Sequence, residues 1–589
     1  YSTALAAPTG GTVAAGSAAI SQNGALTTIN QASQKAIINW NSFGIAKGET
    51  VRFNQPGAAA IALNRVTGNN ASAIYGTLSA NGQVFLVNPN GVLFAKGAQV
   101  NVGGLAASTL GISDTNFLNG NYQFSGDSAK SVVNQGELSA AAKGYIALLG
   151  TNVANEGVIV AKEGTAALGA GSKVNLDFSG DGLLQLSVDK EAVAALASNK
   201  GLIQADGGLV VMSAKSADAL AGTVVNNSGV IEAKSVSTKN GVIRLEGGAN
   251  GTVVNSGTLN ASGLDAGQNG GTVKVLGDKV SLTETAVLNA SGDAAGGTIL
   301  VGGNYQGSGT EQRATETNVT AGASLKADAV NSGNGGTVVV WADKTTTFGG
   351  TISAKGGSQS GDGGQVETSG KQKLTVADTA KVDTTAAKGK TGSWLLDPND
   401  FTVDDNGNQG MKASTLQDAL ELADVTIMTS AGDASVSGAT AETVGGASGN
   451  GDINILAPVS WSAKKLTLSA YRNINIKSTL SATGTSSLDM TSGTGGSGSI
   501  DYGLTASGFT GKVNFGTRSG NGFLTINGTS YTVITSLGNA DSMTGTDLQG
   551  MNGNLNGHYF LGANIDASST SGWNSGAGFT PIGDIDHTA

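Results

Sequence analysis

A short phrase recurs along the middle of the chain, and it limits the folds that the chain can adopt. The phrase is an apolar pair, an asparagine, a glycine and an alternating strand that ends near an alanine. Its copies begin at Val132, Val153, Val224 and Val253. A second phrase, two glycines followed by an apolar strand, begins at Gly270, Gly296, Gly335 and Gly363. Neighbouring copies begin 21 to 39 residues apart, except between Val153 and Val224, where residues 166–220 interrupt the pattern. Such spacings indicate a repeat protein, in which each unit buries its apolar face by stacking on its neighbours.

The type of repeat follows from the strands within each unit. No amphipathic helical pattern recurs, and a propeller blade needs about 40 residues and a motif of its own. Three short strands per unit favour an all-β chain folded as a right-handed parallel β-helix. The 92 glycines among 589 residues suit its many turns. We expect an amino-terminal cap, loops or hairpins extruded from one face, and a rod on the order of 100 Å long.

The asparagines of the first phrase occupy one corner of successive coils. Stacked amide side chains at such a corner hydrogen-bond to one another along the solenoid. The phrase therefore predicts an amide ladder through Asn134, Asn155, Asn226 and Asn255.

Two segments depart from the repeat. Residues 188–197 have a helix-favouring composition and predict a short helix packed across the coils. The repeats end near Trp394, in the run that spans residues 392–403. Ser414 and Gln417 then match a capping box, which predicts a second short helix with apolar residues on one face. Leu416, Ala419, Leu420 and Ala423 form that face.

A tight turn stands out in the amino-terminal quarter of the chain. Residues 83–94 read as two short apolar strands around Asn88, Pro89, Asn90 and Gly91. Proline presets φ at the first corner of a type I turn, asparagine tolerates the second, and glycine relieves the exit. An isolated run of this kind is usually only a turn.

Four neighbouring runs make the turn a more specific signal. They lie at residues 37–45, 51–56, 62–66 and 102–109. Together they resemble the amino-terminal secretion domain of filamentous-haemagglutinin-type exoproteins, the large secreted partners of bacterial two-partner secretion systems. The resemblance implies an outer-membrane transporter that recognises this domain through periplasmic domains. It also implies a protein secreted by, or held at the surface of, a Gram-negative bacterium.

Residue by residue, the resemblance carries over only Asn88, Pro89, Asn90 and Gly91 as the secretion signature. Some members of the family bear a second motif upstream, Asn-Pro-Asn-Leu. Here residues 54–57 read Asn-Gln-Pro-Gly instead, so no role is carried over to them.

The resemblance also suggests a domain organisation. Residues 1–250 would be the secretion domain, and residues 251–395 β-helix repeats. Residues 396–500 would form a second β-helical stretch with a short helix. Residues 501–589 would begin a downstream repeat region that continues in a longer protein.

Trp40 and Phe43 have two candidate roles. An open solenoid end exposes apolar core and unpaired strand edges, so this aromatic pair is expected to cap the first coil. The alternative is a docking surface for the transporter.

Composition excludes several classes of function. A net charge of −10 with no basic face argues against nucleic-acid binding. No apolar run reaches the ~18 residues of a membrane span. The absence of cysteine favours a chain that crosses an oxidising periplasm unfolded. The only histidines, His558 and His587, leave little for a catalytic triad or a zinc site, so we expect no metal and no cofactor. Residues 404–408 resemble part of a calcium loop but read better as a polar turn.

Three functions remain open. The first is a monomeric, secreted adhesin rod that binds host or matrix glycans or proteins in attachment, aggregation or biofilm formation. The second is a carbohydrate-cleaving β-helix enzyme, which needs two carboxylates about 5 to 10 Å apart. Its candidate acids are Asp362, Glu367 and Asp383, or Asp293 and Glu311. The third is the stalk of a contact-dependent toxin. We expect the adhesin and no enzyme.

Overall fold

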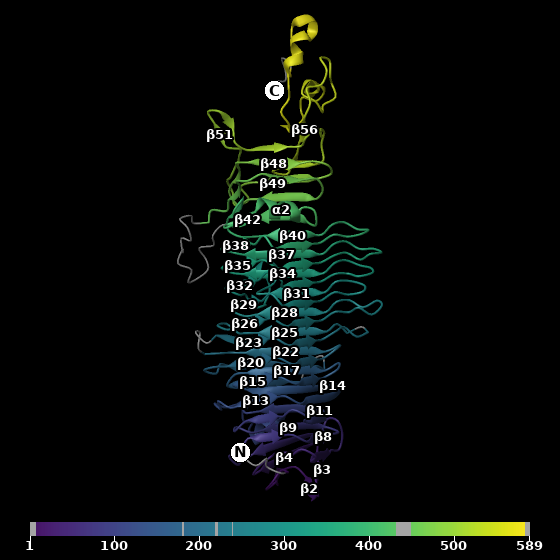
Figure 1. The fold of residues 1–589 in the computed structure, drawn as a ribbon, viewed down its shortest axis with the longest axis vertical. Coiled ribbons are helices and arrows are strands. Elements are labelled where there is room, and N and C mark those ends of the chain that lie inside the picture. The colour runs from purple at the N-terminus through teal and green to yellow at the C-terminus, as the bar shows by residue number, and fades with distance from the viewer. Residues whose placement is uncertain (1–6, 179–181, 218–221, 238, 431–448, 584–589) are drawn as a thin grey trace.

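The protein is a rod of stacked parallel strands (Figure 1). The computed structural model describes residues 7–178, 182–217, 222–237, 239–430 and 449–583. The amino terminus lies at one end of the rod, and residues of increasing number follow one another along its axis (Figure 1). Most coils contribute one strand to each of three rows, as expected for a parallel β-helix.

The longest row contains seventeen described strands, each paired in parallel with the next. At about 4.8 Å per strand this row is about 80 Å long, which accords with the expected rod. Its members are β4 (Lys35–Trp40), β6 (Ile61–Val66), β9 (Gln83–Val87), β11 (Gln99–Ser108), β14 (Glu137–Gly150), β17 (Thr165–Ala170), β22 (Leu209–Ala214), β25 (Val242–Glu246), β28 (Thr272–Leu276), β31 (Thr298–Val301), β34 (Thr337–Ala342), β37 (Gln365–Gly370), β40 (Ser393–Leu396), β43 (Asp424–Met428), β46 (Lys465–Ser469), β49 (Ser487–Thr491) and β54 (Leu524–Ile526).

The second row joins the first through β11 and β14, long strands that serve both. Its other members are β3 (Leu26–Gln31), β5 (Thr50–Asn54), β8 (Thr77–Ala80), β16 (Val158–Val160), β21 (Leu202–Gln204), β24 (Val230–Glu232), β27 (Thr258–Asn260), β30 (Val287–Asn289), β33 (Ser324–Lys326), β36 (Thr351–Ser353) and β39 (Lys381–Asp383). Beyond β39 the helix α2 (Ala413–Ala419) intervenes. A three-stranded sheet follows it, made of β45 (Val459–Trp461), β48 (Thr479–Ala482) and β53 (Lys512–Asn514).

The third row is an eleven-stranded sheet followed by a five-stranded one. The first contains β7 (Ser72–Ile74), β10 (Val92–Phe94), β13 (Ser131–Asn134), β15 (Asn152–Asn155), β20 (Leu196–Asn199), β23 (Thr223–Asn227), β26 (Thr252–Asn255), β29 (Lys279–Leu282), β32 (Glu316–Val319), β35 (Thr345–Phe348) and β38 (Lys373–Val376). The second contains β41 (Phe401–Asp404), β42 (Gly410–Lys412), β44 (Ile453–Ile455), β47 (Ile474–Ile476) and β50 (Ile500–Asp501).

The remaining elements cover the rod or extend its carboxyl-terminal end. The strands β1 (Thr12–Ala15) and β2 (Ala18–Asn23) pair antiparallel with β4 and β3. An outer antiparallel sheet consists of β12 (Tyr122–Ser125), β18 (Lys173–Asp177) and β19 (Gln185–Lys190), beside helix α1 (Asp114–Asn119). The short elements are β51 (Leu504–Thr505), β52 (Gly508–Phe509), β55 (Thr529–Ser530), β56 (Thr532–Ile534), β57 (Tyr559–Leu561), η1 (Tyr305–Gly307), η2 (Gln549–Gly553), η3 (Ser568–Gly572) and η4 (Asn574–Gly576).

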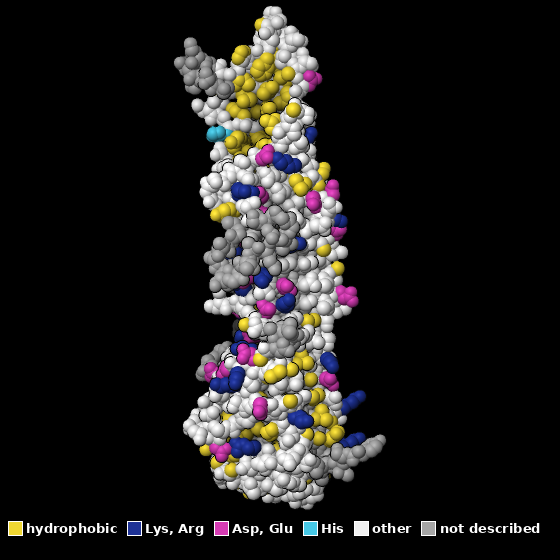
Figure 2. All heavy atoms as spheres, turned by 90° about the vertical axis from the view of Figure 1, so that its left-hand side faces the viewer, with side chains coloured by type: hydrophobic (Ala, Val, Ile, Leu, Met, Phe, Trp, Pro, Cys, Tyr) yellow, Lys and Arg dark blue, Asp and Glu magenta, His cyan; other side chains and the backbone are white. Residues whose placement is uncertain are grey.

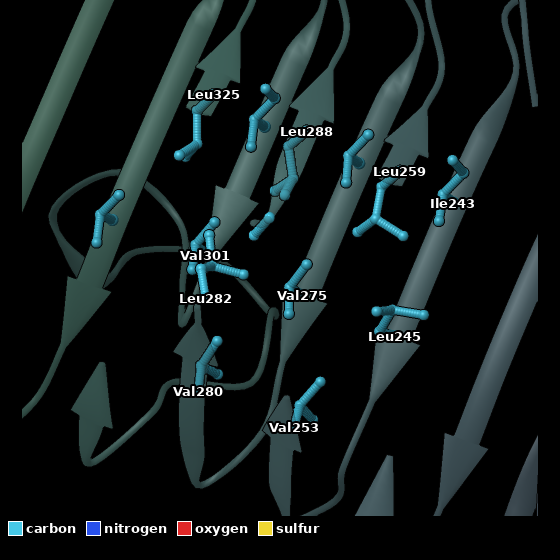
Figure 3. Packing of buried hydrophobic residues seen from close by; sticks show 14 of the residues in the cluster. Ile243, Leu245, Val253, Leu259, Val275, Val280, Leu282, Leu288, Val301 and Leu325 are labelled. Carbon is cyan, nitrogen blue, oxygen red and sulfur yellow. The ribbon is translucent and has the colours of Figure 1, made fainter. Parts of the chain in front are cut away.

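The core consists of like residues stacked in register. Leu259 pairs with Leu288, which pairs with Leu325, and all three side chains are fully buried (Figure 3). The Gly-Gly phrases are also in register, because Thr272, Thr298 and Thr337 lie opposite one another in consecutive coils. Burying one such leucine contributes about 1.5–3 kcal/mol, and each coil obtains this burial only from its neighbours.

The amide ladder exists, but its members differ from the predicted set. It runs from Asn134 through Asn155, Asn199 and Asn227 to Asn255, with donor–acceptor distances of 2.7–2.8 Å. The prediction of Asn226 was wrong, because a bulge in β23 shifts the register between Thr223 and Val225. The ladder ends at Asn255, whose neighbour in the next coil is the apolar Leu282.

Both predicted helices need correction. Residues 188–197 form no helix; Val188 lies in β19, and Ala197 lies in the core of β20, so tertiary packing overrides helix propensity. The second helix is confirmed as α2, with its apolar face buried. Its capping box is wrong, since the N-cap residue is Lys412 and Gln417 Oε1 accepts a hydrogen bond from Ser460 N at 2.9 Å.

Extruded loops project from one edge of the rod between about residues 260 and 392 (Figure 1). They also stack on one another, because Gly292 forms parallel bridges to Gly263 and Ala329 in the adjacent coils. The first strand row runs through residues 250 and 395 without interruption, and the proposed domain boundaries stay predictions.

Candidate functional site

The predicted signature forms a corner between β9 and β10. Gly91 N–H donates to Asn88 O at 3.1 Å and closes the turn, and Gly91 has a φ of +112°, which favours glycine. Asn88 is fully buried, Asn90 half-buried and Pro89 exposed.

Asn88 binds the coils on both sides of its own. Its Nδ2 donates to Asn70 O at 2.9 Å and to Ser72 Oγ at 3.0 Å, in the preceding coil. Its backbone N–H donates to Ser108 O at 2.9 Å, in the following coil. A buried amide with this many partners is costly to replace, because each partner would lose its hydrogen bond.

Asn90 and Pro89 complete the same arrangement. Asn90 Nδ2 donates to Gly68 O at 2.9 Å and to Asn88 Oδ1 at 3.1 Å. Pro89 O accepts a hydrogen bond from Ser128 Oγ at 2.6 Å. The four signature residues therefore act as a clasp that fixes the relative position of three coils.

Trp40 and Phe43 lie at the amino-terminal end of the core, and each is 1% exposed. Their rings meet edge to face at 5.5 Å, and Trp40 Nε1 donates to Asn64 Oδ1 at 3.0 Å. Gly11 lies directly against the Trp40 ring, so the segment that leads into β1 covers it.

An aromatic cluster on the outer face of the rod was not predicted from the sequence. Phe85 packs against Phe117, Tyr122 and Phe124 at ring distances of 5.3–5.9 Å, and these residues belong to α1 and β12. The sequence contains a signal for this cluster, because residues 84–87 are four consecutive apolar residues instead of an alternating run. All four are buried in the structure. A strand that is buried on both faces needs a second layer, which α1 and the antiparallel sheet provide.

The carboxylates considered for catalysis are mostly engaged in local contacts. Asp293 accepts from Gly267 N at 2.7 Å, Glu311 pairs with Lys274 at 2.6 Å, and Asp362 accepts from Lys390 N at 2.8 Å. Asp383 Oδ1 accepts from Thr385 Oγ1 at 2.7 Å. Glu367 differs from these four, because it is fully buried.

The calcium-like segment is a polar turn. Asp404 Oδ1 accepts from Asn406 N at 2.8 Å and from Gly407 N at 2.6 Å. Within the described ranges, no group of three or more His, Cys, Asp or Glu side chains has the arrangement of a metal site. The helices described there are also too short or too polar to cross a membrane.

Comparison with known proteins shows what the chain is similar to. A family model described as the TPS secretion domain matches residues 4–261. Two proteins named heme/hemopexin-binding protein, one from Haemophilus influenzae strain Rd and one from Haemophilus influenzae, are 36% identical over 253 residues and 32% identical over 307 residues. The matches cover 42% and 47% of this chain, but only 28% and 32% of those proteins. The chain thus spans less than a third of the length of these relatives.

A solved structure is similar to a larger part of the chain. The crystal structure of the HMW1 secretion domain from Haemophilus influenzae is 35% identical, with a TM-score of 0.58. The match covers 66% of this chain and 100% of that domain.

Proposed function

Because this chain belongs to the two-partner secretion exoproteins, we propose that it is an adhesin, with coils that direct its export and a rod that presents a binding surface. Proteins of this family are secreted by Gram-negative bacteria or held at their surface, and the secretion domain implies an outer-membrane transporter as partner. The adhesive role and the ligand are our inference.

The unbroken parallel row from β4 to β54 is the observation that supports the proposal most strongly. Each coil needs only the coil before it as a template, so folding proceeds in the order in which the chain emerges from a pore. The chain has no cysteine, so no disulfide opposes threading. Burial of each new coil lowers the free energy of the exported chain, so movement back through the pore is unfavourable. Export therefore needs no nucleotide hydrolysis at the cell surface.

Within this process, the clasp at Asn88, Pro89, Asn90 and Gly91 would fix the first coils as they form. The exposed Pro89 leaves one side of this turn accessible to the transporter. The buried pair Trp40 and Phe43 would close the amino-terminal end of the core, so that folding proceeds toward the carboxyl terminus alone.

Secretion assays with the transporter in a Gram-negative host test the export role. Asn90→Ala is expected to lower the amount of protein outside the cell, and Asn88→Ala to lower it more, because Asn88 has more partners. Asn101→Ala is the matched control, since Asn101 is exposed in β11. Wild-type levels of both clasp variants would refute an export role for the clasp.

The adhesin role predicts binding without chemistry. Purified protein should bind one class of host or matrix glycan or protein, and bacteria that export it should attach to surfaces coated with that ligand. Incubation with bacterial exopolysaccharides should leave them intact; release of oligosaccharides would instead support the carbohydrate-cleaving alternative.

Haem or hemopexin is a second candidate ligand, favoured only by the names of the two relatives. The chain has two histidines, His558 and His587, so it offers few histidine ligands for haem iron. A pull-down with hemopexin, with and without haem, separates this candidate from glycan binding.

A further inference from the structure

One long loop folds back onto the outer face of the rod instead of projecting from it. Residues 302–315 connect β31 to β32 and contain η1, which lies against β34 and β37. Beneath the loop, Leu300, Val339 and Trp341 form a small apolar cluster outside the main core. Gly307 is packed so tightly on Trp341 that an added Cβ would lie 2.6 Å from the indole ring.

Two ion pairs hold the carboxyl-terminal part of the loop in place. Glu311 pairs with Lys274 at 2.6 Å, and Arg313 Nε pairs with Asp343 Oδ2 at 3.0 Å. The loop is therefore a fixed cover for the part of the sheet that it lies on.

Two carboxylates lie under this cover, in adjacent coils. Glu367 in β37 is 0% exposed, and Asp397, directly after β40, is 9% exposed. Glu367 pairs in register with Leu395, so Asp397 is its diagonal neighbour on the sheet. Such diagonal positions are about 7–8 Å apart between Cα atoms, within reach of two side chains that bind one ion.

Gln306 connects the loop to both acids. Its backbone N–H donates to Glu367 Oε2 at 2.8 Å. Its side chain lowers the pKa of Asp397 against the larger effect of burial. The residue has φ 51° and ψ 32°, a left-handed conformation that is unfavourable for glutamine. Strain of this kind persists where the surrounding structure holds it, and is common at ligand-binding sites.

Each carboxylate keeps one buried oxygen without a protein partner. These atoms are Glu367 Oε1 and Asp397 Oδ1, and the buried Asn399 Oδ1, two residues further along the chain, is a third. Burial raises the pKa of Glu367 to about 7, with the charge of Asp397 as a smaller cause. Burial likewise raises the pKa of Asp397 to about 6, against smaller opposing effects of Gln306 and Lys371. A pair of buried acids with unused oxygens is costly unless a cation or protons neutralise it.

We propose that Glu367 and Asp397 bind a calcium ion beneath the loop of residues 302–315. The two carboxylates supply the charge. Ser369 Oγ is a neutral oxygen beside the pair, because it accepts a hydrogen bond from Asp397 N at 3.2 Å. The unpartnered amide oxygen of Asn399, two residues after Asp397, is a further candidate ligand. An irregular set of oxygen donors without nitrogen or sulfur suits calcium better than zinc or magnesium.

The ion would fasten the loop to coils that follow it in the chain. The loop leaves β31, whereas the carboxylates belong to β37 and to the segment after β40. Calcium competes with protons for the carboxylates, so binding tightens from pH 6 to pH 8. Other charged or titratable groups around the site are Tyr305 and Lys371, and the Arg313–Asp343 pair.

Calorimetric titration of the full chain, after removal of metals with a chelator, tests the proposal directly. We expect one calcium site with a Kd on the order of 10⁻⁴ to 10⁻³ M at pH 7.5, as in extracellular calcium modules. We also expect weaker binding at pH 6. Binding undetectable at 10 mM calcium would overturn the proposal.

Terbium luminescence then locates the site. Terbium replaces calcium, and its emission is sensitised by a tryptophan or tyrosine within a few ångströms, here Trp341 or Tyr305. Emission should appear in the wild type, fall on addition of calcium and drop at least tenfold in Glu367→Gln. Asp397→Asn is the second variant, and circular dichroism verifies the fold of each.

Glu284→Gln is the matched control, because it makes the same change of charge at an exposed turn. It should bind terbium and calcium like the wild type. Equal emission from Glu367→Gln, Asp397→Asn and Glu284→Gln would place the ion elsewhere and refute the assignment. These measurements involve neither export nor adhesion. A negative result would therefore refute the calcium site without bearing on the adhesin proposal.

Discussion

Replacing Asn227 with alanine removes a central rung of the buried amide ladder. Asn227 is fully buried, accepts a hydrogen bond from Asn199 Nδ2 at 2.8 Å and donates to Asn255 Oδ1 at 2.7 Å. The variant leaves Asn255 Oδ1 buried without its donor and deprives Asn199 Nδ2 of its best acceptor. At about 1–3 kcal/mol for each orphaned group, we expect a local destabilisation of about 2–4 kcal/mol.

The adjacent Asn226 provides the matched control. It is the same residue type in the same strand, but it is half-exposed and outside the ladder. Asn226→Ala should therefore change stability by less than about 0.5 kcal/mol.

Hydrogen exchange followed by mass spectrometry is the suitable assay, because long solenoids do not unfold in a single two-state step. Peptides covering β23 to β26 should exchange about 30- to 1,000-fold faster in Asn227→Ala, since about 1.4 kcal/mol corresponds to a factor of ten. Peptides near β46 should not change. Equal exchange in the two variants would refute the ladder as a source of stability.

Two further predictions concern the loop of residues 302–315. The pKa of Glu367 is raised from 4.5 to about 7 in the folded chain, so the folded chain binds this proton more tightly than the unfolded chain does. In metal-free buffer, the free energy of unfolding of the loop should therefore fall by about 3 kcal/mol as the pH rises from about 4.5 to about 7. Glu367→Gln should remove this slope, as measured by exchange of the loop amides, and an unchanged slope would contradict the assignment. Gly307→Val should displace the loop, because Gly307 has φ +61° and its Cβ would clash with Trp341; tryptophan fluorescence and protease cleavage of the loop report it. The control Gly57→Val lies in open space and should leave both readouts as in the wild type.

The fold class was predictable because the structural repeat of a solenoid is accompanied by a repeat in its sequence. The copies of the Gly-Gly phrase lie in register in consecutive coils, as their spacing indicated. Stacking of like residues is a nearest-neighbour property, so a repeat in sequence becomes a repeat in space. The tight turn at Asn88–Gly91 was also predictable, since turn residues specify their own backbone conformation.

Register inside a repeat was harder to predict. Aligning the copies by their apolar pairs selected Asn226 and missed Asn199. Every ladder member precedes a glycine by two residues, so alignment on the glycine would have selected Asn199 and Asn227 correctly. The bulge in β23 accommodates the extra residue of this copy and causes the discrepancy.

The sequence alone thus determined the solenoid, its turns and its apolar core, because these depend on local period and on neighbouring coils. Only the tertiary structure decided what covers the outer face. Phe85 meets α1 and β12, and Glu367 meets a loop that begins more than 60 residues earlier, through contacts between segments that share no period. Such contacts depend on which part of the rod each long connection packs against. The repeat pattern in the sequence does not specify these packing positions.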